Sequence, residues 1–472
     1  MPTGDCPQQR EERHIMTTTT LPEAHHQAPQ ATSSAPGRLG RLTALSFAIG
    51  ASSALLLTLV AAFRGAPEPV LTGSGLIGFA LGWALLAVLS SRRTDEPQRW
   101  AAVPAAVMGV TGIVLAATAP DDAALTTAGW VWAPAMLALA AWTAVRATRS
   151  LHSKARAWLV LPALVLLALV SLGGLVETVR VTSDSASMPM PGRSVDIGGR
   201  TLHLHCSGTG APTVVLEGGL GEMSSSWSGI ADDVSVTSRV CAYDRAGQGW
   251  SDDTDASRDA LGIAADLHAL LEKSGEPGPY VLVGHSSGGL YAMTYAAEHP
   301  DDVAGMVLLD ATNPYLLEAS LAGKAGGGSG PLALLPSLAR MGLAQLMPSS
   351  AGTNLDARAA AAFQAFESTA RAATNTVDEV SEYARVFPQA RTLTTLGSRP
   401  LVVVTLADKE ATDAAGYAAQ QRFSQLSTNS ALRTADTTHS GLVDDRHGAT
   451  FSVRAIADVV EAVRAGTVLA QP

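Results

Sequence analysis

Five long stretches without a charged residue occupy much of the first 181 residues of this 472-residue chain. A helix rises about 1.5 Å per residue, so about 20 residues cross a hydrocarbon core of about 30 Å. Because charged residues bound every stretch, the pattern predicts five membrane-spanning helices rather than buried helices of a water-soluble domain. The predicted spans are residues 42–63, 69–91, 100–120, 123–145 and 157–176.

Basic residues in the connecting segments predict the orientation of the spans. Two arginines directly precede the first span, and Arg and Lys are in excess between the second and third spans and between the fourth and fifth. These residues stay on the cytoplasmic side of a membrane, so we expect a cytoplasmic N-terminus and an extracytoplasmic C-terminal domain. They are Arg38, Arg41, Arg92, Arg93, Arg99, Arg146, Arg149, Lys154 and Arg156.

The two ends of the chain differ from the membrane region in composition. Residues 1–41 are rich in Thr, Pro, Gln and Ser without an apolar period, so they are predicted to be a disordered tail. Residues 182–472 carry 19 basic and 32 acidic residues, which argues against nucleic acid as a partner. We therefore expect a tail at 1–41, a transmembrane region at 42–181 and a globular domain at 190–472.

Short apolar stretches alternate with amphipathic segments in the globular part. This alternation predicts an α/β domain with a mostly parallel sheet and helices on both faces. Reactive groups of such sheets gather at the carboxyl ends of the strands. The expected strands are Thr201–Cys206, Thr213–Glu217, Arg239–Tyr243, Tyr280–Val283, Met306–Asp310, Leu401–Thr405 and Ala431–Ala435, with helices at Ala260–Leu271, Leu290–Glu298 and Phe451–Val463.

The sharpest local signal is the sequence Gly284-His285-Ser286-Ser287-Gly288, which follows a predicted strand and precedes a predicted helix. A tight strand-to-helix turn presents its serine as a nucleophile, and small residues on either side let strand and helix approach closely. An ordinary glycine-rich turn is the alternative. The flanking strand and helix favour Ser286 as a nucleophile.

A serine hydroxyl needs a base to become a nucleophile. His439 lies just before the last helix, at the carboxyl edge of the predicted sheet, and is the first candidate, with His447 as the second. His285 adjoins the serine, where its ring is badly placed to reach the serine oxygen. His203 and His205 could be a metal pair, but no third ligand lies nearby in the sequence, so no metal is expected.

Three further blocks accompany the serine motif: Leu216-Glu217-Gly218-Gly219-Leu220-Gly221, the stretch 243–252 (YDRAGQGWSD), and Thr438-His439. With the serine motif, they make residues 190–465 resemble the α/β-hydrolase superfamily with an esterase- or lipase-like core. The resemblance implies an α/β-hydrolase fold. The membrane region lies outside it.

The resemblance also implies roles for individual residues. Ser286 would attack an acyl carbon, and His439 would accept its proton and later protonate the leaving group. The backbone N–H groups of Leu220 and Ser287 would bind the oxyanion. The family's usual His-Gly is Gly218-Gly219 here, which backbone donation tolerates. A serine at this position implies cleavage of an ester, thioester, lactone or amide, and no cofactor.

Two aspartates remain alternatives for the acid that orients the histidine. Members of the superfamily usually carry it after the strand matching Leu401–Thr405, which indicates Asp408. A second arrangement carries it after the preceding strand, which indicates Asp310. Asp244 is instead expected to be a structural partner of Arg245 within its own turn.

Residues 311–395 are expected to form a helical cap, with helices at Leu332–Met347 and Leu355–Thr374 that shape an acyl pocket. Cys206 and Cys241 fall on strands that are neighbours in this fold and could form a disulfide outside the cytoplasm. The sequence thus predicts a membrane-anchored serine hydrolase acting on a small or lipid-like acyl substrate at the bilayer. The alternative is a non-catalytic ligand-binding domain of the same fold on the same anchor.

Overall fold

The computed structural model describes residues 38–150, 154–254, 256–315, 330–346 and 354–470. Most of the predicted N-terminal tail, residues 1–37, lies outside the described residues. Within them, five helices are long and apolar enough to cross a membrane, as the charge-free stretches predict. They are α1 (Arg38–Phe63), α2 (Glu68–Arg93), α3 (Ala102–Thr118, preceded by η1, Arg99–Ala101), α4 (Asp122–Ser150) and α5 (Lys154–Ser187).

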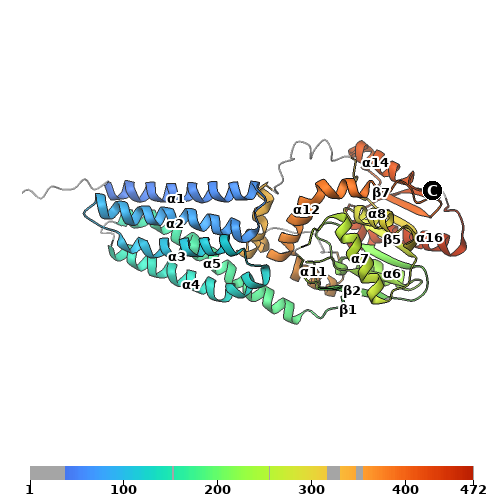
Figure 1. Ribbon diagram of the computed structural model, residues 1–472, viewed down its shortest axis with the longest axis horizontal. Helices are drawn as coiled ribbons and strands as arrows, with labels where there is room; N and C mark the ends of the chain where they lie inside the picture. Colours follow the sequence, from blue (N-terminus) through green and yellow to red (C-terminus); the bar gives the residue numbers. More distant parts are fainter. Residues whose placement is uncertain (1–37, 151–153, 255, 316–329, 347–353, 471–472) are drawn as a thin grey trace, which may run out of the picture.

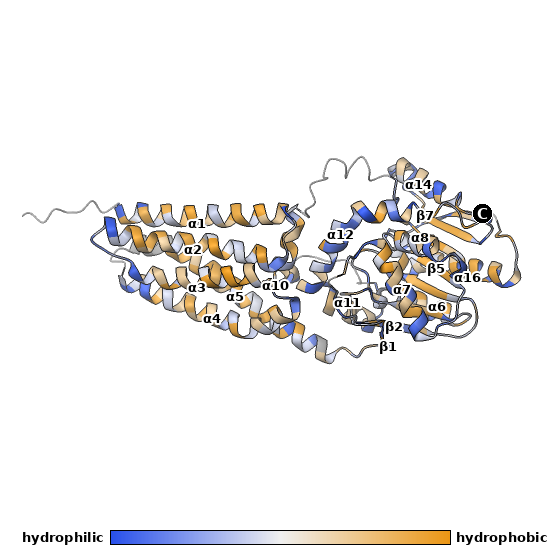
Figure 2. Cartoon of the chain, viewed as in Figure 1, coloured by the Kyte–Doolittle hydropathy of each residue, from blue (hydrophilic) through white to orange (hydrophobic). Residues whose placement is uncertain are grey.

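The five helices form one elongated bundle, and α5 leaves it towards the α/β domain (Figure 1). Consecutive helices alternate in direction, so α2 and α4 end, and α3 and α5 begin, at the end of the bundle that faces away from that domain (Figure 1). Apolar residues run along the helices in Figure 2. Many of the large apolar side chains are exposed in the absence of lipid, for example Leu55 and Leu169, as helices that face hydrocarbon require.

The α/β domain is built on an eight-stranded sheet in the order β1-β2-β4-β3-β5-β6-β7-β8. In this order the pairs from β4 to β8 are parallel, while the β1–β2 and β2–β4 pairs at one edge are antiparallel. The strands are β1 (Arg193–Asp196), β2 (Thr201–Ser207), β3 (Thr213–Glu217), β4 (Val240–Tyr243), β5 (Tyr280–His285), β6 (Val303–Leu309), β7 (Leu401–Leu406) and β8 (Ser430–Ala435).

Helices cover both faces of this sheet, because its central strands are apolar on both sides. In β3, Val214 and Leu216 pack with α6 (Ser228–Ser235) and α16 (Arg446–Ala465) on one face. Val215 points to the other face, which α7 (Ala260–Ser274), α8 (Gly288–Glu298) and α14 (Ala414–Ser424) cover. This arrangement confirms the predicted mostly parallel sheet and the α/β-hydrolase fold.

The cap between β6 and β7 differs from the prediction in its helices. Up to residue 346, where the described part of the expected helix Leu332–Met347 ends, it is divided into η4 (Gly330–Leu334), α10 (Leu335–Arg340) and η5 (Leu343–Leu346). Gly342, with a φ of +75°, separates α10 from η5. The expected helix at Leu355–Thr374 is two helices, α11 (Ala357–Glu367) and α12 (Ala370–Ala390). The break falls at Thr369, whose hydroxyl caps the start of α12.

The two cysteines of the sheet are bonded to each other. Cys206 on β2 is directly opposite Cys241 on β4 in the antiparallel register, and they form a disulfide. The covalent bond links the antiparallel edge to the central strands.

Candidate active site

Ser286 occupies the turn between β5 and α8 with a φ of +52°. Its amide donates to the carbonyl of Leu309, and its carbonyl accepts from Thr312. Left-handed backbone is costly for a residue other than glycine and persists only where its surroundings enforce it. Among the described residues only Ala119, Ser286 and Asp310 share a positive φ without being glycine. Two of the three are thus candidate site residues from the sequence.

Close backbone packing explains the glycines on either side of Ser286. A Cβ on Gly284 would lie 2.6 Å from Cα of Gly289, and one on Gly288 would lie 2.2 Å from the carbonyl oxygen of Glu217. Any side chain at either position would push the strand and the helix apart. The sequence thus forms the tight turn that presents the Ser286 hydroxyl.

His439 and Asp310 meet beside this turn. Nδ1 of His439 lies 2.7 Å from Oδ2 of Asp310, and Lys409 donates to the other carboxylate oxygen. Burial alone would raise the pKa of Asp310, but the hydrogen bonds from His439 and Lys409 outweigh it and hold that pKa below its usual value. Asp310 is therefore an anion that fixes the imidazole of His439.

The imidazole of His439 stays accessible on the other side, because its side chain is 46 % exposed. Its ring lies 4.6 Å from the His285 ring, centroid to centroid. Among the described residues no hydrogen bond joins His439 to the Ser286 hydroxyl. In sites of this kind such a bond is often long until a substrate binds.

Asp408, the other candidate acid, is exposed at the start of α13 (Lys409–Thr412). The structure thus brings Asp310, and not Asp408, against the histidine.

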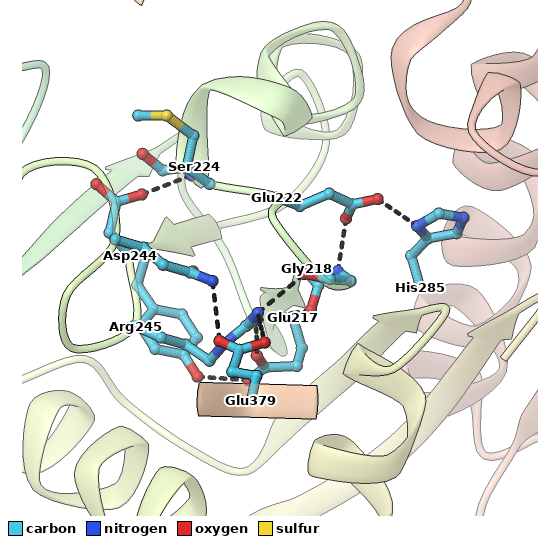
Figure 3. A network of polar contacts seen from close by, with 12 residues as sticks. Glu217, Gly218, Glu222, Ser224, Asp244, Arg245, His285 and Glu379 are labelled. Carbon is cyan, nitrogen blue, oxygen red and sulfur yellow. Dashed lines mark hydrogen bonds and ion pairs between the residues drawn. The ribbon is translucent and has the colours of Figure 1, made fainter. Parts of the chain in front are cut away.

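Of the predicted oxyanion donors, Ser287 lies in the turn itself and Leu220 lies in the loop after β3. Among the hydrogen bonds of the described residues, neither Leu220 N–H nor Ser287 N–H has a partner. Arg245 donates to the carbonyl oxygens of Gly218 (2.7 Å) and Gly219 (2.8 Å). In a trans peptide the N–H points away from the C=O, so the bond to the Gly219 carbonyl aims the Leu220 N–H in the opposite direction. Figure 3 shows Arg245 reaching this loop.

Two buried carboxylates hold Arg245. Glu217 of β3 accepts from it at 2.9 Å and Glu379 of α12 at 3.0 Å, and both carboxylates are 2 % exposed. The cap helix α12 is therefore connected through one guanidinium to the 218–221 loop, which carries the predicted oxyanion donor Leu220 (Figure 3).

The expected pairing of Asp244 with Arg245 is wrong. Asp244 instead pairs with His203 at 2.9 Å and accepts from the amides of Ser224 and Trp250.

A second carboxylate–histidine pair supports the same loop. Glu222 accepts from the amide of Gly219 at 2.7 Å and from Nδ1 of His285 at 2.5 Å (Figure 3). Nε2 of His285 lies 2.9 Å from the carbonyl oxygen of His439. Burial opposes a charged ring, but the Glu222 carboxylate outweighs it, and the pKa of His285 is raised. With acceptors at both ring nitrogens, His285 is a buried imidazolium. Through Glu222 it connects the turn to the 218–221 loop, and through the carbonyl of His439 it connects the turn to the loop before α15 (Gly441–Asp444).

Sequence reasoning missed Glu222, Glu379 and Lys409. The signal for Glu379 was available, since Asn375, Glu379 and Val386 share the buried face of α12, and a charged residue among buried helix positions is rarely unpaired. Glu222 and Lys409 carry no comparable signal.

Glu217 gives this network a testable pH dependence. Burial raises its pKa to about 7, although Arg245 and the Tyr243 hydroxyl favour the anion. The folded state therefore keeps a proton that the unfolded chain releases near its ordinary pKa of 4.5, and stability falls as the pH rises between these values. Glu217→Gln should remove this fall. Thermal unfolding of both proteins in detergent, from acidic to alkaline pH, checks it; parallel curves would contradict the assignment.

Comparisons with known proteins agree with this fold. Residues 212–385 match the family model for the α/β hydrolase fold. The chain is 32 % identical over 136 residues to 2-(acetamidomethylene)succinate hydrolase of Mesorhizobium japonicum, covering 29 % of this chain and 48 % of that protein. It is 37 % identical over 117 residues to lipase LipV of Mycobacterium tuberculosis, covering 23 % and 41 %. Each match thus spans less than half of the relative.

The solved structures that resemble the chain include a thermophilic esterase from Thermogutta terrifontis, with 18 % identity and a TM-score of 0.45, over 57 % of this chain and 98 % of that one. The sheet order and the family match define the class of the domain. Residues 212–385 thus belong to a domain with the α/β hydrolase fold, which five helices able to span a membrane precede, and the relatives named above are a hydrolase and a lipase.

Proposed function

We propose that this protein is a membrane-anchored serine hydrolase that cleaves a carboxylic ester or a related acyl bond through Ser286, His439 and Asp310. The observation that carries the proposal is the 2.7 Å contact of His439 with the buried Asp310 carboxylate, next to a serine held at positive φ. Asp310 is the acid in this proposal, and Asp408 has no part in it.

The geometry supports acyl transfer in two steps. Nε2 of His439 removes the Ser286 hydroxyl proton while Oγ forms a bond to the acyl carbon. The carbonyl oxygen becomes an oxyanion, bound by the N–H groups of Leu220 and Ser287. His439 then protonates the departing alcohol. A water molecule, deprotonated by His439, attacks the acyl-enzyme and releases the carboxylic acid with the serine restored.

Several features support an extracytoplasmic position for the hydrolase domain. The basic connections lie at the far end of the bundle (Figure 1), where they would remain in the cytoplasm. The Cys206–Cys241 disulfide belongs to an oxidising compartment. We therefore assign residues 42–181 to the membrane and 190–472, with the cap at 311–395, to the outside. A reporter fused to the C-terminus, active only outside the cytoplasm, tests this topology.

Labelling with a fluorophosphonate probe tests the chemistry. Mass spectrometry of the labelled protein should locate the adduct on Ser286, and Ser286→Ala should remain unlabelled. An adduct on another residue would overturn the choice of nucleophile. A folded wild-type protein that does not react would support the alternative, a ligand-binding domain without catalysis.

A further inference from the structure

The cap is attached to the membrane helices at the bundle end that faces the hydrolase domain. Arg340 of α10 contacts Glu68 of α2 at 2.6 Å and Asp122 of α4 at 2.7 Å. The Ser337 hydroxyl lies 2.9 Å from that of Thr72. Because the cap also holds Glu379, its position is coupled to both the membrane helices and the active site.

The contact between cap and bundle includes the backbone. A Cβ on Gly173 of α5 would lie 2.2 Å from the carbonyl oxygen of Met341, and one on Gly342 would lie 2.9 Å from the carbonyl oxygen of Gly173. Only glycines permit this approach. The cap segment η4–α10–η5 therefore lies against the first turns of α2 and α4 and against the side of α5.

This cap segment also exposes apolar side chains. Four leucines along it are between 38 % and 77 % exposed. Isolated from lipid, such a row exposes apolar surface to water, whereas a segment at the edge of a bilayer can bury it among acyl chains. Continuity with the lipid-facing helices makes the bilayer the partner of this surface. The residues are Leu332, Leu338, Leu343 and Leu346.

Two cavities follow one another from the membrane helices towards the oxyanion loop. The outer cavity, about 170 Å³, is lined by α4 and α5 on one side, including Val181, and by α10 to α12 on the other. The inner cavity, about 30 Å³, shares Phe366, Thr369 and Arg371 with it and continues to Gly221, next to Leu220. The outer cavity thus lies between the cap and the bundle, and the inner cavity lies between the cap and the loops after β3 and β4, so together they extend from the membrane helices to Gly221.

A separate route joins the site to water. The His439 side chain is exposed, and an open cavity of about 700 Å³ beside its loop is lined by Thr438 and His447. Water and polar products therefore have a route that does not use these two cavities.

From these observations we infer that the substrate is a long-chain acyl ester dissolved in the bilayer, which reaches Ser286 through the outer and inner cavities. The inference rests on the serine hydrolase function proposed above and adds its substrate class. The route is narrow at Phe366 and Arg371, so passage of an acyl chain requires these side chains to move.

The test compares two esters with the full-length protein in phosphatidylcholine vesicles. Para-nitrophenyl acetate reaches the enzyme from water, and para-nitrophenyl oleate resides in the bilayer. Ala372→Trp fills the inner cavity, which Ala372 lines, and should lower the ratio of oleate to acetate turnover about tenfold. The matched control is Ala384→Trp, an exposed position on the same helix, which should leave the ratio unchanged.

A second pair tests the outer cavity independently. Val181→Trp should lower the ratio in the same way, while Val179→Trp, at a position 42 % exposed on the same helix, should not. Unchanged ratios in both cavity variants would overturn the inference, as would a wild-type enzyme that hydrolyses only the acetate. Absence of fluorophosphonate labelling and of hydrolysis of both esters would instead overturn the proposed function itself.

Discussion

Replacing Asp310 with Asn is expected to lower kcat for an acyl ester about ten-thousandfold and to leave KM within about twofold. The carboxylate accepts from Nδ1 of His439, which leaves Nε2 free as the base and stabilises the imidazolium that forms. An amide at this position would present either an N–H or a neutral oxygen to the His439 ring. It would not balance the positive charge of the imidazolium. Steady-state hydrolysis of para-nitrophenyl acetate measures the effect.

Asp408→Asn is the matched control, with the same change of a carboxylate to an amide. Asp408 is exposed, so its replacement should change the free energy of unfolding by less than about 0.5 kcal/mol and leave kcat nearly unchanged. Thermal unfolding of each variant distinguishes lost catalysis from lost folding. A large loss of kcat in Asp408→Asn, with normal turnover in Asp310→Asn, would reverse the assignment of the acid.

The helices and strands that could be predicted from the sequence are those with a local signal, such as a continuous run of apolar residues. The five long apolar helices have such a run, and so do β3 and β5, which are buried along their whole length. Strand β1 went unpredicted because it has a single buried residue, Val195. Such an edge strand lacks the apolar run that identifies a central strand.

The choice between Asp310 and Asp408 depends on contacts between distant parts of the chain. Each follows one of two adjacent parallel strands, β6 and β7, so both occur near the same sheet edge and their spacing from Ser286 does not decide between them. The structure separates them because Asp310 turns into a positive φ of 38° and points its carboxylate at His439. No local sequence rule predicts that turn.

The failed pairing of Asp244 with Arg245 has a simple geometric cause. They are consecutive residues just after β4, and their side chains point in different directions (Figure 3). Asp244 therefore points to His203, while Arg245 points to Glu217 and the cap. Asp244 and Arg245 are adjacent in sequence, but their side chains have different partners and do not pair with each other.

Arg245→Met is expected to have the second largest effect, lowering kcat by about two to three orders of magnitude. The variant loses the hydrogen bonds that hold the Gly218 and Gly219 carbonyls, so the Leu220 N–H is no longer aimed at the oxyanion. KM should change little, because this contact strengthens only in the transition state. Arg245 acts through the loop and is a positioning residue.

Arg245→Met should also destabilise the fold by about 3–5 kcal/mol, because it leaves Glu217 and Glu379 buried without a cation. A triple variant that adds Glu217→Gln and Glu379→Gln removes both charges and should recover most of the thermal stability. Its kcat should stay low, because both carbonyls still lack the guanidinium and the Gly219 carbonyl keeps only the amide of Glu222 as a donor. If the triple variant recovers both kcat and stability, Arg245 only stabilises the fold. If it recovers stability while kcat stays low, the cap, through Glu379 and Arg245, helps to form the oxyanion site.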